Sequence, residues 1–237
     1  MTNIKCVSIK ESRFNNIKES LENGLKIHNL QSYFPILSIF FDFHNNSNKH
    51  FKLKNIYSIL NIKDKLLLEK DDTYIKHFFK CDIIDNINQI QEKNIFVKIL
   101  PILNVIQYMM DDYNTQHSSS LPNIYHYLTN NKINNYHNSA YIDAFFSYLG
   151  SNLSVKGKCP TFPLFFETFS GIQEEFLFDI TEEYSSLKKT SWFNDCILQK
   201  KYEIINVDAD SLATHKKKPS KINFEAIDDL NFDELNV

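Results

Sequence analysis

The side chains that could take part in chemistry are scattered along this sequence and form no metal-binding pattern. The eight histidines include no pair at i, i+4 spacing with a third ligand nearby, as a helical zinc site requires. The cysteines are far apart and include no Cys-x-x-Cys pair, so we expect reduced thiols rather than a zinc site or a disulfide framework. The four cysteines are Cys6, Cys81, Cys159 and Cys196.

Signatures of nucleophilic catalysis and of phosphate-binding loops are also missing from the sequence. No Gly-x-Ser-x-Gly surrounds any serine, and the chain has only four glycines, which is little material for a phosphate-cradling loop. Glu182 and Glu183 suit the dipole at the start of a helix better than a catalytic pair. Lys216–Lys218, beside Pro219, is typical of a solvated linker. The sequence therefore predicts no catalytic residue of its own.

The composition predicts a folded protein with no general attraction to nucleic acid or membranes. The 237 residues are 43% hydrophobic and 14% aromatic, enough to bury a substantial core. The formal net charge of −3 provides no field toward nucleic acid or an anionic membrane. The most apolar stretch, residues 33–43, is too short to cross a bilayer and contains Pro35 and Asp42. We interpret it as a buried strand and expect an intracellular, non-membrane protein.

The amino-terminal half is expected to alternate helices and strands. Spacing of Phe14, Ile17, Leu21 and Leu25 predicts an amphipathic helix that ends near Gly24. A polar loop or hairpin tip is expected at 44–48, a short helix within 51–68, a strand at 73–80 and a loop at 81–91. The run 95–100 is the clearest strand, and it contains one charged residue, Lys98.

The carboxy-terminal half is expected to contain the best helix of the chain. Asn138 can cap a helix that runs to about Leu153, since Tyr141, Phe145 and Leu149 recur every four residues. Shorter elements are expected around it: a helix in 102–113, a loop at 118–123, a hairpin of 162–169 with 174–180, and a short helix capped by Thr181. A polar linker at 208–220 then precedes an acidic amphipathic tail, Ile222–Val237, that could dock on its own domain or on another protein. The fold class predicted is α+β, an antiparallel sheet with packed helices.

Four blocks of this sequence together resemble a known family. They are NIFVKILPIL at 94–103, HNSAYIDAFF at 137–146, CPTFPLFF at 159–166 and FDITEEY at 178–184. They resemble the amino-terminal half of the protein-kinase-like proteins of giant DNA viruses of the mimivirus type, and the resemblance covers residues from about Ile95 to the end. It implies a kinase nucleotide lobe at 91–205, preceded by an extension at 1–90 and followed by the linker and tail at 206–237. It also implies a location in the host cytoplasm or the virion.

The same resemblance assigns roles to two residues. In kinase-like folds a lysine on the third strand contacts the nucleotide phosphates, and an acid from the next helix holds it. Lys98 and Asp143 match these places, with ATP and magnesium as the implied cofactor. Each residue also has a plainer interpretation, Lys98 as a half-buried strand lysine that reaches solvent and Asp143 as a solvent-facing acid in the first turn of a helix.

The sequence departs from the kinase pattern in three respects. No Gly-x-Gly-x-x-Gly precedes Lys98, and the acid is Asp rather than Glu. No His-x-Asp catalytic loop and no Asp-Phe-Gly follow Asp143, and the superficially similar Asp42-Phe43-His44 lies upstream of Lys98. Kinase activity would thus require a catalytic lobe beyond Val237. The alternative is a non-enzymatic viral interaction or virion protein on the same scaffold, and nucleic-acid binding ranks last.

Overall fold

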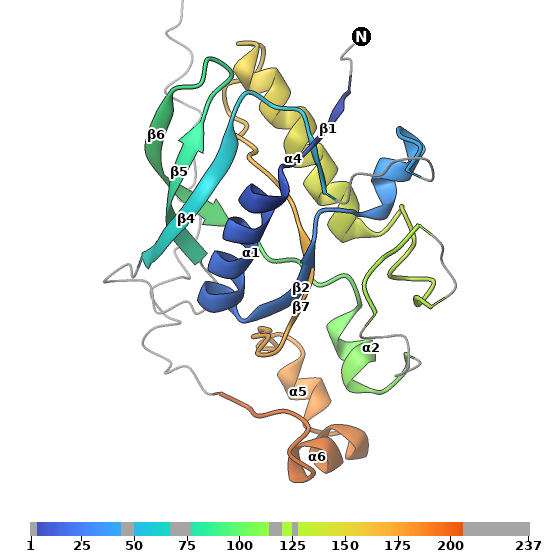
Figure 1. The fold of residues 1–237 in the computed structure, drawn as a ribbon. Coiled ribbons are helices and arrows are strands. Elements are labelled where there is room, and N and C mark those ends of the chain that lie inside the picture. The colour runs from blue at the N-terminus through green and yellow to red at the C-terminus, as the bar shows by residue number, and fades with distance from the viewer. Residues whose placement is uncertain (1–3, 44–49, 67–76, 114–119, 125–127, 206–237) are drawn as a thin grey trace, which may run out of the picture. The chain divides into compact units, whose positions relative to one another are not determined.

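A computed structural model describes residues 4–43, 50–66, 77–113, 120–124 and 128–205, with only the backbone described at 64–66. The chain forms two compact units, Met1–Asn194 and Asp195–Val237. The first unit is α+β, as predicted, with short antiparallel sheets and helices (Figure 1). The expected polar loop at 44–48, the linker and the acidic tail lie outside the described residues.

The largest sheet of the first unit is an antiparallel meander of three consecutive strands. These are β4 (Ser58–Leu66), β5 (His77–Ile84) and β6 (Ile90–Val97), in the order β4-β5-β6. Asp85 organises the β5–β6 turn, because its Oδ1 accepts hydrogen bonds from the backbone N–H groups of Ile87 and Gln89 at 3.0 and 2.8 Å. The sheet joins residues on both sides of position 90, where a domain boundary was predicted.

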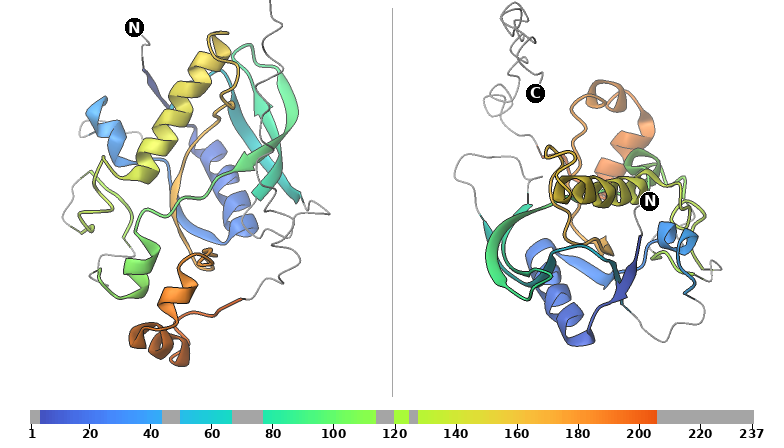
Figure 2. Two further views of the ribbon diagram at one scale, coloured as in Figure 1. Left: turned by 180° about the vertical axis from the view of Figure 1, so that it is seen from behind. Right: turned by 90° about the horizontal axis from the view of Figure 1, so that it is seen from above.

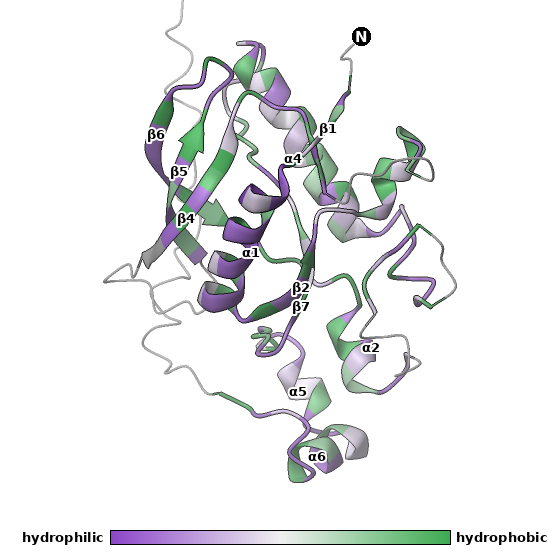
Figure 3. Cartoon of the chain, in the orientation of Figure 1, coloured by the Kyte–Doolittle hydropathy of each residue, from purple (hydrophilic) through white to green (hydrophobic). Residues whose placement is uncertain are grey.

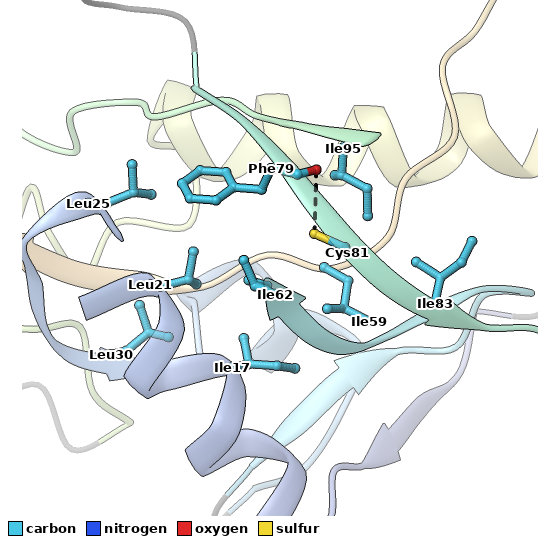
Figure 4. Packing of buried hydrophobic residues seen from close by; sticks show 10 residues of the cluster. All are labelled: Ile17, Leu21, Leu25, Leu30, Ile59, Ile62, Phe79, Cys81, Ile83 and Ile95. Carbon is cyan, nitrogen blue, oxygen red and sulfur yellow. Dashed lines mark hydrogen bonds between the residues drawn. The ribbon is translucent and has the colours of Figure 1, made fainter. Parts of the chain in front are cut away.

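Helix α1 (Glu11–Leu25) covers one face of this sheet. The views in Figures 1 and 2 show the strands curving around it. Its buried residues are those that the sequence predicted, and they pack against alternate residues of β5, including Phe79, Cys81 and Ile83 (Figure 4). The helix ends at Leu25, next to Gly24, as predicted. A Cβ at Gly24 would lie 3.0 Å from the Phe79 ring, so this glycine also permits close packing of the helix on the sheet.

The second large helix, α4 (Ser139–Val155), confirms the prediction of a helix capped by Asn138. Its buried residues Tyr141, Phe145 and Tyr148 pack in a separate core with Phe34, Leu37 and neighbouring residues, rather than against the three-stranded sheet. The helix that packs on the sheet is therefore α1.

Residues 33–43 do not form the predicted strand. Pro35 instead begins a 3-10 helix, η1 (Pro35–Ile39), because its ring fixes φ near the helical value and it has no N–H for a sheet. The helix predicted within 51–68 was also wrong. That segment forms β3 (Phe51–Leu53), paired with β1 (Cys6–Ser8), and then β4.

The hairpin predicted at 162–180 is replaced by a long-range pairing. Strand β7 (Ser170–Gln173) pairs with β2 (Ile27–Gln31). A Cβ at Gly171 would lie 2.4 Å from the Ile27 side chain, so the glycine serves strand contact and not a turn. Thr181 caps no helix; it donates to Asp179, while the short helix α5 (Tyr184–Leu187) begins three residues later.

Two further short helices complete the described chain. Helix α2 (Val105–Met109) falls within the predicted 102–113 segment and is capped by Asn104. Helix α6 (Ser191–Leu198) continues into the second unit, where its last turn is followed by Lys200 with φ of 55°. Hydropathy varies along most elements, with apolar and polar residues on the same strand or helix (Figure 3). Within the described residues no helix is long and apolar enough to cross a membrane.

Candidate functional site

The structure brings together the two residues that the kinase-like resemblance selects. The ammonium Nζ of Lys98 lies 2.8 Å from Oδ1 of Asp143 and donates a hydrogen bond to it. Both side chains are largely open to solvent, with exposed fractions of 52% and 40%. The pair is thus a surface ion pair, accessible to a ligand from outside.

Strand alternation explains where Lys98 points. Strand β6 ends at Val97, so Lys98 follows it directly instead of lying inside the predicted 95–100 strand. Val97 and Ile99 pack against the core under α1, while Phe96 is 49% exposed. Because neighbouring residues in extended chain face opposite sides, Lys98 shares the outer side with Phe96.

Asn138 fixes the acid partner in place. Its side-chain oxygen accepts the N–H of Ala140 at 3.1 Å, which caps α4. Its side-chain Nδ2 also donates to the carbonyls of Ile102, at 2.7 Å, and Lys132, at 3.1 Å. Ile102 lies four residues after Lys98, so this buried amide ties the start of α4 to the segment that carries the lysine. The sequence indicated the cap but not this second role.

Other ion pairs on the same sheet give the Lys98–Asp143 pair its context. Lys80 lies 2.7 Å from Glu92, and Lys63 lies 2.8 Å from Asp82 and 3.0 Å from Glu92. These pairs join strands of one sheet, and Lys63–Glu92 reaches across β5 from β4 to β6. Lys98 and Asp143 instead join the end of the sheet to a helix, and they are 45 residues apart in the chain. Lys80 and Glu92 are similarly exposed, at 41% and 44%, and so provide a matched control.

A second charged group, which the sequence did not suggest, is buried between α1, β3 and the segment after α4. The Glu167 side chain is only 1% exposed, and its Oε1 contacts both Arg13 and Lys52. Arg13 also donates to the carbonyl of Ile59, and Lys52 donates to Ser58. Nothing in the local sequence signals this cluster, because Arg13 and Glu167 are 154 residues apart.

Burial lowers the pKa of both cations in this cluster. Burial lowers the pKa of Arg13 to about 10. Burial, and then the positive charge of Arg13, lower the pKa of Lys52 to about 8. The other carboxylate oxygen, Glu167 Oε2, is buried without a hydrogen-bond partner. Two cations thus share a single oxygen, an arrangement that holds elements together and leaves no open face for a substrate.

Neither a metal-binding group among the described residues nor a match to a known protein adds a further site. Within the described ranges no three His, Cys, Asp or Glu side chains are grouped so that they could hold a metal ion. No protein-family model, curated protein or solved structure matches the chain.

Proposed function

We propose that this chain carries a nucleotide-lobe-like module of a protein-kinase-like protein, in which Lys98, directly after the β4-β5-β6 sheet, contacts the phosphates of ATP. The observation that carries this proposal is the 2.8 Å ion pair between Lys98 and Asp143. A lysine ammonium has three donor hydrogens, so the bond to Asp143 would leave two for phosphate oxygens. Asp143 would act by aiming a flexible four-carbon side chain.

Chain order supports the same proposal. The lysine follows the third strand of an antiparallel meander, and the acid comes from the next long helix, the order that kinase-like folds use. Catalysis would need a base and metal ligands that this chain does not carry in kinase order. We therefore propose nucleotide binding, with phosphate transfer dependent on residues beyond Val237.

Thermal unfolding with ATP and magnesium tests the proposal. A ligand that binds the folded state raises its stability by mass action, so the wild-type melting temperature should rise with ATP concentration. The rise should disappear in Lys98→Ala and shrink in Asp143→Asn. The matched control Lys80→Ala, which removes a similarly exposed ion pair within the β4-β5-β6 sheet, should keep the rise. An unchanged wild-type melting temperature at millimolar ATP, or an equal loss in the control, would refute Lys98 as a phosphate ligand.

One specific observation favours a second candidate, a non-enzymatic interaction protein. The outer face of α4 carries an apolar stripe in which Phe146 is 68% exposed and Leu153 is 40% exposed. Gly150 lies between these two residues on the helix, and the Phe162 ring packs against it. A Cβ on Gly150 would lie only 2.7 Å from that ring. Exposed large apolar groups in a row are typical of protein contact surfaces.

Site-specific crosslinking tests this second candidate. A photoreactive phenylalanine analogue at position 146 should crosslink to one defined protein in the cells that produce this chain. The same analogue at Phe176, a separate exposed aromatic position, should not capture that protein. Identical capture at both positions would count against a specific surface on α4.

A further inference from the structure

The chain that follows η1 lines two adjoining hollows with aromatic side chains. Their volumes are about 460 and 370 Å³, and both are lined by Phe40, Phe41, Asp42 and Phe43. The larger hollow also reaches Tyr33. We call these five residues the aromatic pocket. It involves neither Lys98 nor Asp143.

The rings of the aromatic pocket meet at steep angles and so form corners. Tyr33 and Phe43 have ring centroids 5.6 Å apart at an interplanar angle of 84°. Phe41 and Phe43 are 6.2 Å apart at 68°. The face of each ring is the negative side of its quadrupole, and a cation within about 6 Å of a ring centroid is attracted to it. Corners of this kind let one cation meet more than one ring.

Packing outside the aromatic pocket holds these rings in position. Phe43 is only 8% exposed and packs against Phe51, with centroids 5.0 Å apart. Phe40 stacks on Phe145 of α4 at 5.2 Å and 19°, yet remains 44% exposed. A ligand would therefore meet walls that are already ordered, which reduces the entropic cost of binding.

The charge of the pocket favours a positively charged ligand. Asp42 is exposed, lies between Phe41 and Phe43 in sequence, and lines both hollows. The described residues that line the hollows include no lysine or arginine. A carboxylate beside aromatic faces attracts cations and repels phosphates, so the pocket is unsuited to the nucleotide proposed above.

From these observations we propose that the aromatic pocket binds an alkylated ammonium cation, such as a quaternary ammonium group. Methyl groups on the nitrogen give the ligand an apolar surface that fits ring faces, while its charge interacts with the rings and with Asp42. A bare ammonium is more strongly hydrated and gains less from leaving water. The ligand class is thus set by both the rings and the carboxylate.

A pair of isosteric probes tests the proposal on the purified full chain. Choline and tetramethylammonium are titrated by NMR in parallel with 3,3-dimethyl-1-butanol, the uncharged carbon analogue of choline. The cations should bind saturably, with upfield shifts of their methyl signals from the ring currents. The uncharged analogue should bind at least about tenfold more weakly, since it lacks the charge that the rings and Asp42 attract.

Variants then assign the binding to the pocket. Phe41→Leu and Asp42→Asn should each weaken choline binding by about threefold to thirtyfold. Phe176→Leu replaces an exposed aromatic side chain that stacks with Phe178, and it should leave choline binding unchanged. Equal affinity for choline and its uncharged analogue would overturn the proposal, as would unchanged binding in both pocket variants. Circular dichroism checks that each variant folds, and the probe comparison on the wild type decides the question if one does not.

Discussion

The side-chain amide of Asn138 donates a 2.7 Å hydrogen bond to the backbone carbonyl of Ile102, while its oxygen caps α4. One buried residue therefore fixes both the start of the helix and its distance from the segment after β6. The Lys98–Asp143 pair joins the same two elements on the surface. The buried bond, and not the exposed ion pair, should be the stronger of the two links.

Replacing Asn138 separates its two roles. Asn138→Ala removes both the cap and the amide donor, and should lower the free energy of unfolding by about 2 kcal/mol or more. Asn138→Ser keeps a capping oxygen but does not reproduce the amide donor, and should lose about 1 kcal/mol. Urea unfolding followed by circular dichroism measures both. Equal stability of Asn138→Ser and wild type would show that the bond to Ile102 contributes nothing.

Charge reversal of the surface pair tests stability apart from ligand binding. Lys98→Asp and Asp143→Lys should each destabilise by no more than about 1 kcal/mol, because both partners are exposed and screened by water. The double variant should regain most of that loss. It should not regain the ATP-dependent rise in melting temperature, because the cation would then project from α4 instead of from the end of β6. Recovery of the ATP effect in the double variant would indicate that the pair binds phosphate by net charge alone.

Local patterns predicted the two long helices, because their apolar spacing and the Asn138 cap are encoded within a few turns of chain. The segment 51–68 misled the prediction for a physical reason. Ile59 and Ile62 are three residues apart, a helical spacing, and both are buried against α1. They share a face of a strand because the register of β4 against β5 shifts between Ile59 and Asn61. A bulge of this kind depends on the partner strand and leaves no signal in the segment itself.

Long-range contacts were similarly beyond the reach of sequence patterns. The local sequence around Gly171 predicts a turn, but the glycine is needed for the close approach of β7 to Ile27. The sequence predicted part of the candidate site, since the resemblance selected Lys98 and Asp143, and these two residues do form an ion pair. The sequence did not predict the role of Glu167, because its two cationic partners come from distant elements and no spacing rule connects them.

The buried charge cluster should respond unequally to loss of its members. Glu167→Ala leaves Arg13 and Lys52 buried together without an anion, and should cost about 3–5 kcal/mol of unfolding free energy. Lys52→Met leaves a single Arg13–Glu167 pair and removes a buried cation, so it should cost far less, or stabilise the fold. Urea unfolding at neutral pH compares the two. Greater damage from Lys52→Met than from Glu167→Ala would contradict this account of the cluster.

The lowered pKa of Lys52 predicts a rise in stability above neutral pH. In the folded protein Lys52 loses its proton near pH 8, whereas in the unfolded chain it keeps the proton up to its ordinary pKa of 10.5. Between these values the unfolded state binds more protons, so the free energy of unfolding increases with pH. Below about pH 8 the lysine is charged in both states and its contribution no longer changes with pH.

Comparison with Lys52→Met isolates this effect. Burial raises the pKa of Cys6 and of Cys81 to about 11, so these thiols make stability fall with pH above 9 in both proteins. The difference in unfolding free energy between wild type and Lys52→Met, measured in urea from pH 7 to 9.5, should therefore move steadily in favour of the wild type. A difference that stays constant across this range would mean that Lys52 remains charged in the folded state, and that Glu167 offsets its burial in spite of being shared with Arg13.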